Sequence, residues 1–267
     1  ASDVYKRQGL KEAAEEVSGV SFKKWEGKRS AAQITEVKVL NEHGAKALGK
    51  PMGSYLTLEA DKLLMPDEDF HSEVSDELAL LLKGLLKQKT GKNILVAGLG
   101  NQSVTPDSLG PRTVSNLCVS AEGLKAIAPG VMAQTGMETA RILLGIIKEV
   151  QPDLVIAIDA LAARSIRRLG TTIQLTDTGI HPGSGVGNHR HSLTKETLGI
   201  PVLAIGVPTV VGAAAIVHDT ISALLGVLSS QAETKNTGKW IQNMDPEDQY
   251  RPVSYTHLRA HETSAHL

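Results

Sequence analysis

The spacing of apolar residues predicts different structures in the two parts of the chain. In the first part, apolar and polar residues alternate over Gln33–Asn41 and again over Ser54–Ala60, as in half-buried strands. Pro51 and Gly53 are turn residues between the two runs, so we expect a small antiparallel pair of strands. Asp67–Lys87 has apolar residues every three or four positions, which predicts an amphipathic helix.

From residue 93 onward, short apolar runs alternate with helical stretches. The predicted strands are Ile94–Ala97, Leu154–Ile158, Thr171–Leu175 and Val202–Val207, and the predicted helices are Met137–Val150 and Ala213–Leu228. Strands separated by helices imply right-handed crossovers, and apolar strands without alternation imply a sheet covered on both faces. We therefore expect one α/β domain over residues 9–253, with a mostly parallel twisted sheet and helices on both faces.

Composition excludes several classes of protein. The 267 residues, 41% of them hydrophobic, can form a sizeable core, and 28 Lys and Arg against 29 Asp and Glu leave a net charge of -1. Such a balance argues against binding nucleic acid or an anionic membrane by bulk charge. No apolar run reaches the ~18–20 residues that cross a bilayer. One cysteine, Cys118, fits a cytoplasmic protein without disulfides, and its apolar neighbours predict that it is buried.

The two ends of the chain differ from the rest. Ala1–Gln8 and Ser254–Leu267 resemble peptides that arise when sequencing-adapter DNA is translated by mistake. We therefore expect both segments to be non-native and exclude them from the predicted domain. The histidines of the second segment are excluded with it.

Polar residues follow three of the predicted strands. Asp107 lies in the loop after the first strand of the second region, and Asp159 directly follows the next strand. Asp177 and His181 follow the third. Because ligands of open α/β sheets bind at the carboxyl ends of parallel strands, we expect Asp107, Asp159 and either Asp177 or His181 at one edge of the sheet.

Two interpretations of the aspartates remain open. Asp is a preferred residue at the start of a helix, so Asp107 and Asp159 could each cap one. A carboxylate directly after a dry strand is costly unless it is paired, bonded or functional. Two carboxyl groups a few ångströms apart do not both ionise, so one can act as an acid and the other as a base.

A glycine-rich loop follows the third strand. Gly183, Ser184 and Gly185 could present backbone N–H groups to an anion or oxyanion, or could simply form a tight turn. Ser184 lacks the glycine that a nucleophile elbow carries two residues before its serine, since Pro182 stands there, and this disfavours serine hydrolase chemistry. We predict that this loop, together with Asn101 and His181, binds substrate or its oxyanion.

The longer strings around these residues are unusual, and DTGIHPGSGVGN is the most distinctive of them. They comprise Asn41–Ala60, Gly98–Asn101, Val104–Pro111, Ile156–Ser165, Thr176–Asn188 and Lys195–Val211. Together they closely resemble the germination protease family of spore-forming bacteria. The resemblance extends from about Gln33 to about Thr220.

The resemblance implies an atypical aspartic endopeptidase of the spore core, with a fold like that of the hydrogenase maturation proteases. Members degrade small acid-soluble spore proteins during germination, are made as zymogens that lose an N-terminal propeptide, and assemble as homotetramers without a cofactor. The family's catalytic aspartates match Asp107 of the TPDSLGP string and Asp159 of the IDALAARS string. Relatives often carry an acidic residue where this chain has Gly212.

Two alternative functions belong to other classes. Asp107, Asp159 and His181 could instead hold a divalent metal ion that activates water, which would make the protein a metal-dependent hydrolase. The same edge of the sheet could also bind an extended peptide without cleaving it. Chelator sensitivity distinguishes the first alternative, and binding without turnover distinguishes the second.

Overall fold

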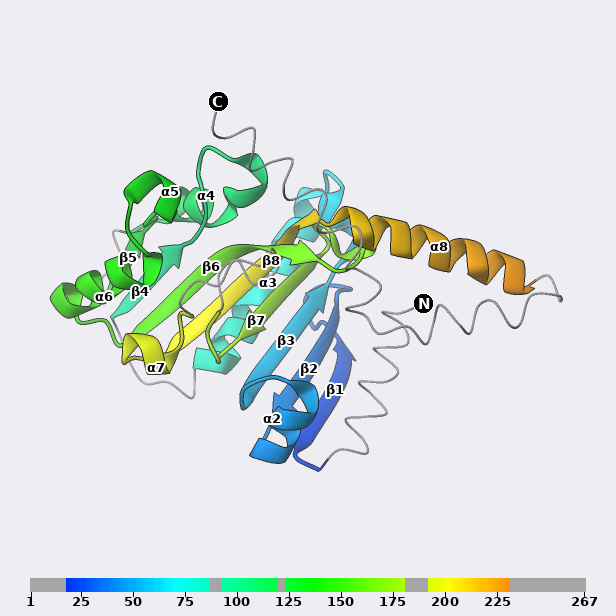
Figure 1. Cartoon of the computed structure of the whole chain (residues 1–267), viewed down its shortest axis with the longest axis horizontal. Helices are drawn as coiled ribbons and strands as arrows, with labels where there is room; N and C mark the ends of the chain where they lie inside the picture. The colour runs from blue at the N-terminus through cyan, green and yellow to red at the C-terminus, as the bar shows by residue number, and fades with distance from the viewer. Residues whose placement is uncertain (1–17, 87–92, 120–122, 181–191, 231–267) are drawn as a thin grey trace.

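The computed structural model describes residues 18–86, 93–119, 123–180 and 192–230, which form one mixed sheet with helices on both faces (Figure 1). The strands of this part are β1 (Val20–Glu26), β2 (Gln33–Val39), β3 (Gly53–Glu59), β4 (Ile94–Gly98), β5 (Leu124–Ile127), β6 (Leu154–Ala163), β7 (Thr172–Thr176) and β8 (Val202–Val211). The α-helices are α2 (Glu42–Leu48), α3 (Glu68–Leu86), α4 (Leu109–Asn116), α5 (Met132–Thr135), α6 (Thr139–Val150), α7 (Lys195–Leu198) and α8 (Ala213–Ser230). Short 3-10 helices are η1 (Asp61–Leu64), η2 (Thr105–Asp107) and η3 (Ile166–Arg168).

The antiparallel pair predicted near the N-terminus is confirmed. β2 and β3 pair antiparallel with Val37 opposite Tyr55, and β1 adds a third antiparallel strand on the outer side of β2. The helix predicted from Asp67 to Lys87 is also confirmed, since α3 differs from it by one residue at each end.

The prediction of a mostly parallel sheet is wrong, because four of the seven strand pairings are antiparallel. The sheet order is β1-β2-β3-β7-β8-β6-β4-β5, and the parallel pairs are β8 with β6, β6 with β4 and β4 with β5. The reason lies in the connection from β6 to β7, which is residues 164–171. A parallel return needs a crossover of a dozen or more residues, so this short connection sends β7 back antiparallel.

Helices cover both faces of the sheet, as the apolar strands predicted. On one face, Val74 and Leu85 of α3 pack in a core cluster with sheet residues such as Leu175. On the other face, Leu143 of α6 and Leu198 of α7 pack in a second cluster. Along β6, alternate residues enter different clusters, with Leu154 in the first and Val155 and Ala157 in the second. Because the side-chain period of a strand is two, this alternation fixes the face to which each later residue of β6 points.

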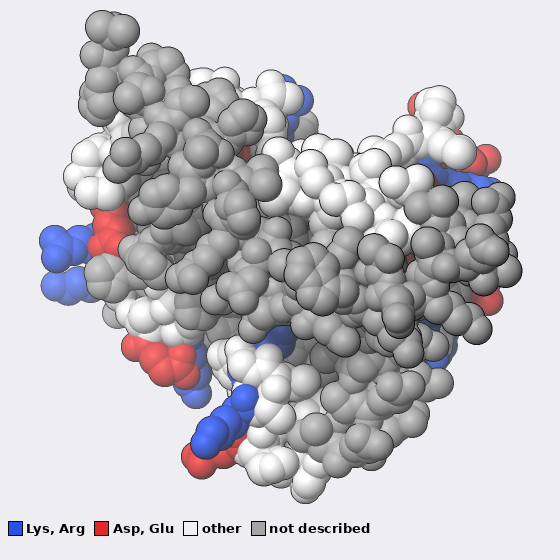
Figure 2. Space-filling view, turned by 45° about the vertical axis from the view of Figure 1, so that its right-hand side comes forward, with Lys and Arg blue, Asp and Glu red and all other residues white. Residues whose placement is uncertain are grey.

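The described residues visible in Figure 2 do not gather charges of one sign. Among the described residues there, Lys and Arg are interspersed with Asp and Glu around the outline, and uncharged residues lie between them. None of the helices in the described part of the chain is long and apolar enough to span a membrane. Cys118, predicted to be buried, is exposed, because the chain has left α4 two residues earlier.

Candidate active site

Asp107 lies in a loop between β4 and α4 that folds back on itself. Its backbone N–H donates to the carbonyl of Val104 at 2.9 Å, and its Oδ2 accepts the N–H of Asn101 at 2.7 Å. Gly100 makes this turn with φ of 112°, and a β-carbon there would collide with the carbonyl oxygen of Asp107. Only glycine tolerates both conditions, so the Gly-Asn pair after β4 allows the loop to bind the Asp107 carboxylate.

The helix that follows Asp107 packs directly on the ends of the parallel strands. A β-carbon on Gly110 of α4 would collide with backbone atoms of Leu99 and lie 2.6 Å from the carbonyl oxygen of Ile158. The N–H of Leu99 also donates to that carbonyl at 2.7 Å. Thr209 of β8 donates its hydroxyl to the carbonyl of Pro106 at 2.6 Å. The Asp107 loop is therefore fixed to β6 and β8 from both sides.

Asp159 lies within β6 rather than after it. The strand continues to Ala163 because β8 is equally long and pairs with it, with Asp159 opposite Gly206. The interpretation of Asp159 as a helix cap is therefore wrong. Its side chain is 7% exposed, and Oδ1 accepts the N–H of Ala160 at 2.9 Å. By alternation with Val155 and Ala157, Asp159 points to the face covered by α6 and α7.

The structure places Asp159 in β6 and Asp107 in the loop that follows the neighbouring strand β4. Gly98, the last residue of β4, is in register with Ile158, the residue before Asp159. The residue that binds the Asp107 carboxylate, Asn101, is only three positions beyond Gly98. A carboxylate inside an apolar strand and a second one held at the adjacent strand end form a candidate pair for acid–base chemistry.

Asp177 does not join this pair, contrary to the expectation of three groups at one edge. β7 is antiparallel to β8, with Thr176 opposite Ala204, so its end points toward the amino ends of the parallel strands. Oδ1 of Asp177 instead accepts the N–H of Ser54 at 2.7 Å. Asp177 therefore joins the end of β7 to the start of β3.

The predicted binding residues His181, Gly183, Ser184 and Gly185 lie outside the described residues. The residues on either side of that segment are described. Ile180 and Leu193 form an antiparallel bridge with N–H···O distances of 3.0 and 2.8 Å. Both side chains pack in the core cluster that contains Leu143 of α6 and Leu198 of α7.

Gln134 is a site neighbour that the sequence did not indicate. It lies in α5, and its Nε2 donates to Oδ1 of Asn101 at 2.7 Å. The same Oδ1 accepts the N–H of Ser103 at 2.9 Å. The predicted substrate-binding residue Asn101 therefore contacts Asp107 through its backbone and α5 through its side chain. The two side chains are 33 residues apart in sequence, and no local pattern signals their contact.

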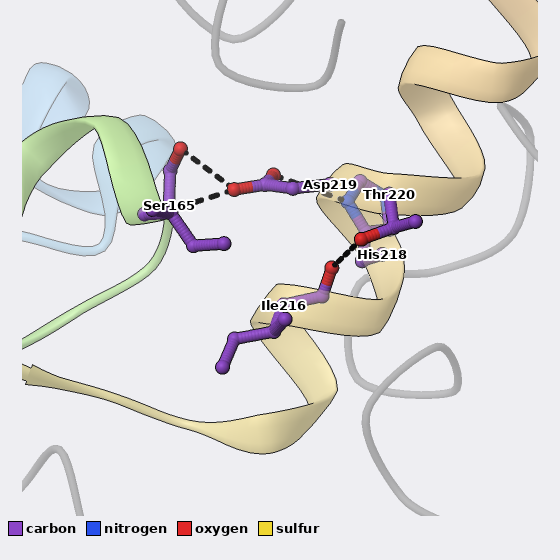
Figure 3. Close-up of polar contacts among 6 residues, drawn as sticks. Ser165, Ile216, His218, Asp219 and Thr220 are labelled. Carbon is purple, nitrogen blue, oxygen red and sulfur yellow. Dashed lines mark hydrogen bonds and ion pairs between the residues drawn. The ribbon is translucent and has the colours of Figure 1, made fainter.

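Asp219 is a second residue that the sequence did not indicate. Figure 3 shows it pointing from α8 toward Ser165, which follows β6. Oδ2 of Asp219 accepts the hydroxyl of Ser165 at 2.9 Å and the N–H of Ile166 at 3.0 Å. One carboxylate thus caps η3 and connects α8 to the end of the strand that carries Asp159.

The described part of the chain contains no group of three or more His, Cys, Asp or Glu side chains arranged to hold a metal ion. Asp107 and Asp159 alone supply two carboxylates, and the third predicted ligand, His181, is not among the described residues.

Comparison with known proteins identifies the class and then the family. A family model described as germination protease, a class of peptidase, matches residues 1–248. The germination protease of Caldanaerobacter subterraneus is 48% identical over 250 residues, covering 88% of this chain and 76% of its own. That of Oceanobacillus iheyensis is 44% identical, covering 95% and 71%, and that of Clostridium tetani is 38% identical, covering 95% and 81%. The chain therefore belongs to the germination protease family.

A solved structure was also matched. The [NiFe] hydrogenase maturation protease of Thermococcus kodakarensis shares 10% identity and a TM-score of 0.24, covering 53% of this chain and 99% of its own. At that score the match carries no argument about the fold. The sequence matches show the family membership, and the family supports a peptidase with a role in spores.

Proposed function

We propose that the protein is an aspartic endopeptidase that starts the degradation of small acid-soluble spore proteins when a spore germinates. Family membership supports the peptidase activity and the spore setting. The observation that carries the proposed aspartic mechanism is that Asp159 is buried within β6, while Asp107 lies in the loop after β4, the neighbouring parallel strand. Its location in this proposal is the spore core.

In the proposed reaction, a water molecule attacks the peptide carbonyl carbon directly. One of Asp107 and Asp159 takes a proton from the water as its oxygen bonds to that carbon, while the other, protonated, gives its proton to the carbonyl oxygen. When the C–N bond breaks, the first aspartate returns its proton to the amine. The hydroxyl proton of the intermediate returns to the second, which restores both groups.

The two carboxyl groups have different surroundings, which suits a reaction in which one acts as a base and the other as an acid. Asp159 lies in an apolar face, where electrostatic interactions are stronger than in water. Asp107 is half-buried and held by a backbone N–H on a loop fixed to β6 and β8.

The substrate in this proposal approaches from the face of α6 and α7. Asp159 points to that face, and Ile180 and Leu193, which flank the segment containing His181, Gly183, Ser184 and Gly185 in sequence, pack in the core cluster there. We propose that this segment binds the extended substrate or its oxyanion. The protein would act without a cofactor, on a protein substrate, as a zymogen-derived homotetramer.

Replacing either aspartate by asparagine tests the mechanism. Asp107→Asn and Asp159→Asn keep the side-chain volume and remove the acid–base function, so each should lower kcat by about 10²–10⁴-fold. Cleavage of a purified small acid-soluble spore protein is followed by gel electrophoresis and mass spectrometry, with and without a chelator. Asp177→Asn is the matched control.

Three outcomes would contradict the proposal. Near-normal turnover of Asp107→Asn or Asp159→Asn would show that the replaced aspartate is not needed for the reaction. Loss of activity in chelator, restored by a divalent metal, would favour the metal-dependent alternative. Binding of the spore protein without cleavage after long incubation would favour a peptide-binding role.

A further inference from the structure

The side chain of Gln134 is fixed at both ends of its amide. Its Nε2 donates to Oδ1 of Asn101 at 2.7 Å, and its Oε1 accepts the N–H of Val131 at the longer distance of 3.5 Å. Gly130 precedes this turn with φ of 74°, and a β-carbon there would lie 3.3 Å from the same Oε1. The local backbone thus sets the direction in which the Gln134 amide points.

Asn101 connects Gln134 to Asp107 of the proposed active site. Its side-chain oxygen binds Gln134 and the N–H of Ser103, while its own backbone N–H donates to Oδ2 of Asp107 at 2.7 Å. The side chain and the backbone of one residue therefore connect α5 to the carboxylate. Gly100, directly before it, has φ of 112°, and a β-carbon there would collide with the carbonyl oxygen of Asp107.

These bonds lie where they contribute little to the core. Gln134 is exposed and Asn101 is half-exposed, and neither belongs to the two apolar clusters. A hydrogen bond between exposed side chains adds little to stability, since water replaces it readily. The bonds contribute little to stability, and their remaining effect is to orient the peptide group between Gly100 and Asn101.

We propose that Gln134 is a positioning residue for peptide-bond cleavage, acting through Asn101 to hold the Asp107 carboxylate in its reactive orientation. The inference rests on the proposed role of Asp107. Gln134 does not touch the reacting atoms. Its donor fixes the Asn101 side chain, which fixes the N–H that binds Asp107, and errors of about 1 Å in a reacting group can cost about 10²-fold in rate.

The test compares two glutamines of the same region. Gln134→Met keeps the length of the side chain and removes the donor, and Gln134→Glu replaces the donor by an acceptor. Gln102→Met is the matched control, because Gln102 is exposed in the Asp107 loop and its side chain makes no hydrogen bond in the described part of the structure. Measured quantities are kcat, KM, the pH dependence of kcat and the melting temperature of the full chain.

We expect both Gln134 variants to lower kcat by about 10–10²-fold with unchanged KM and melting temperature, and to displace the pH profile of kcat. Combining Gln134→Met with Asn101→Ala should add no further loss beyond Asn101→Ala alone, because both act on one path. Equal kcat for Gln134→Met and Gln102→Met would overturn the inference. So would a fall in kcat matched by a fall in melting temperature.

Asp107→Asn, measured in parallel, separates the two proposals. If that variant turns over normally, the role of Asp107 fails and the inference fails with it. If Asp107→Asn is inactive while Gln134→Met is normal, the mechanism stands and only the positioning role of Gln134 is wrong.

Discussion

Asp159 and Asp177 are both aspartates close to the end of an apolar strand, but their surroundings give them different tasks. Asp159 lies inside β6, 7% exposed, on the face of α6 and α7. Asp177 lies at the far end of an antiparallel strand and accepts the backbone N–H of Ser54. The residue type is the same in the two cases, but Asp159 lies within a parallel strand and Asp177 follows an antiparallel one. This difference separates a candidate catalytic group from one that connects two strands.

Asp177→Ala should lower the free energy of unfolding and leave peptidase turnover unchanged. The N–H of Ser54, a residue that is 7% exposed, loses its acceptor, and an unsatisfied buried donor costs about 1–3 kcal/mol. Urea unfolding measures the loss, and Asp177→Asn, which keeps Oδ1, should lose less. Loss of turnover with unchanged stability would instead indicate that Asp177 takes part in the reaction.

Sequence patterns identified both candidate aspartates but not their supports. Gln134 and Thr209 are ordinary polar residues whose partners lie 33 and 103 positions away, and nothing local marks them. Gly100 carried a weak signal, since a Gly-Asn pair after a strand indicates a turn. The carboxylates could be predicted because their type is unusual for their place, whereas the groups that hold them are decided by tertiary contacts.

At the scale of elements, α4 packs unusually close to the strands that it follows. Gly98 in β4 and Gly110 in α4 face each other, and a β-carbon on either would collide with the backbone of the other segment. The 3-10 turn that carries Asp107 lies between these two glycines in sequence. The close packing therefore determines where the Asp107 loop lies relative to β6.

Gly110→Ala should therefore reduce both stability and activity. Its β-carbon would meet backbone atoms of Leu99 and Ile158, which cannot rotate away, and overpacking of this kind costs about 1–3 kcal/mol. Thermal unfolding and peptide cleavage measure the two effects. Gly145→Ala in α6 is the control, because nothing lies within 4 Å of its β-carbon position and alanine favours a helix by about 0.5–1 kcal/mol. Equal melting temperatures for the two variants would contradict the account.

The elements themselves were largely predictable, and their directions were not. Alternation and helical periodicity located β2, β3, α3 and α6 to within two residues. The predicted end of β6 was wrong, because Asp159 is unfavourable in a strand and only pairing with β8 keeps it there. The direction of β7 follows from the short connection between β6 and β7. The sequence alone does not show that this connection is too short for a parallel return, because that depends on the sheet order.

At the scale of the whole molecule, α8 presents apolar residues to solvent. Figure 1 shows this helix extending away from the sheet, and Val217, Ile221 and Leu224 are 48, 39 and 57% exposed. Their spacing of four and three residues places them on one side of the helix. An apolar row of this kind supports the proposed assembly into an oligomer.

Leu224→Glu should weaken that assembly, because it places a charge in the apolar row of α8. Ala223→Glu is the matched control, since Ala223 is also exposed but lies on a different side of the helix. Sedimentation velocity should show a smaller species for Leu224→Glu and an unchanged one for Ala223→Glu. The same sedimentation coefficient for both variants and the unmodified chain would remove α8 from the interface.

The most direct test of the central claim is the kcat/KM of Asp107→Asn, Asp159→Asn and the double variant on one spore protein substrate. If the two carboxyl groups act as a single unit, each single variant loses nearly all of the activity and the double variant loses no more. Losses that multiply in the double variant would contradict the account, because they would mean that the two aspartates act independently.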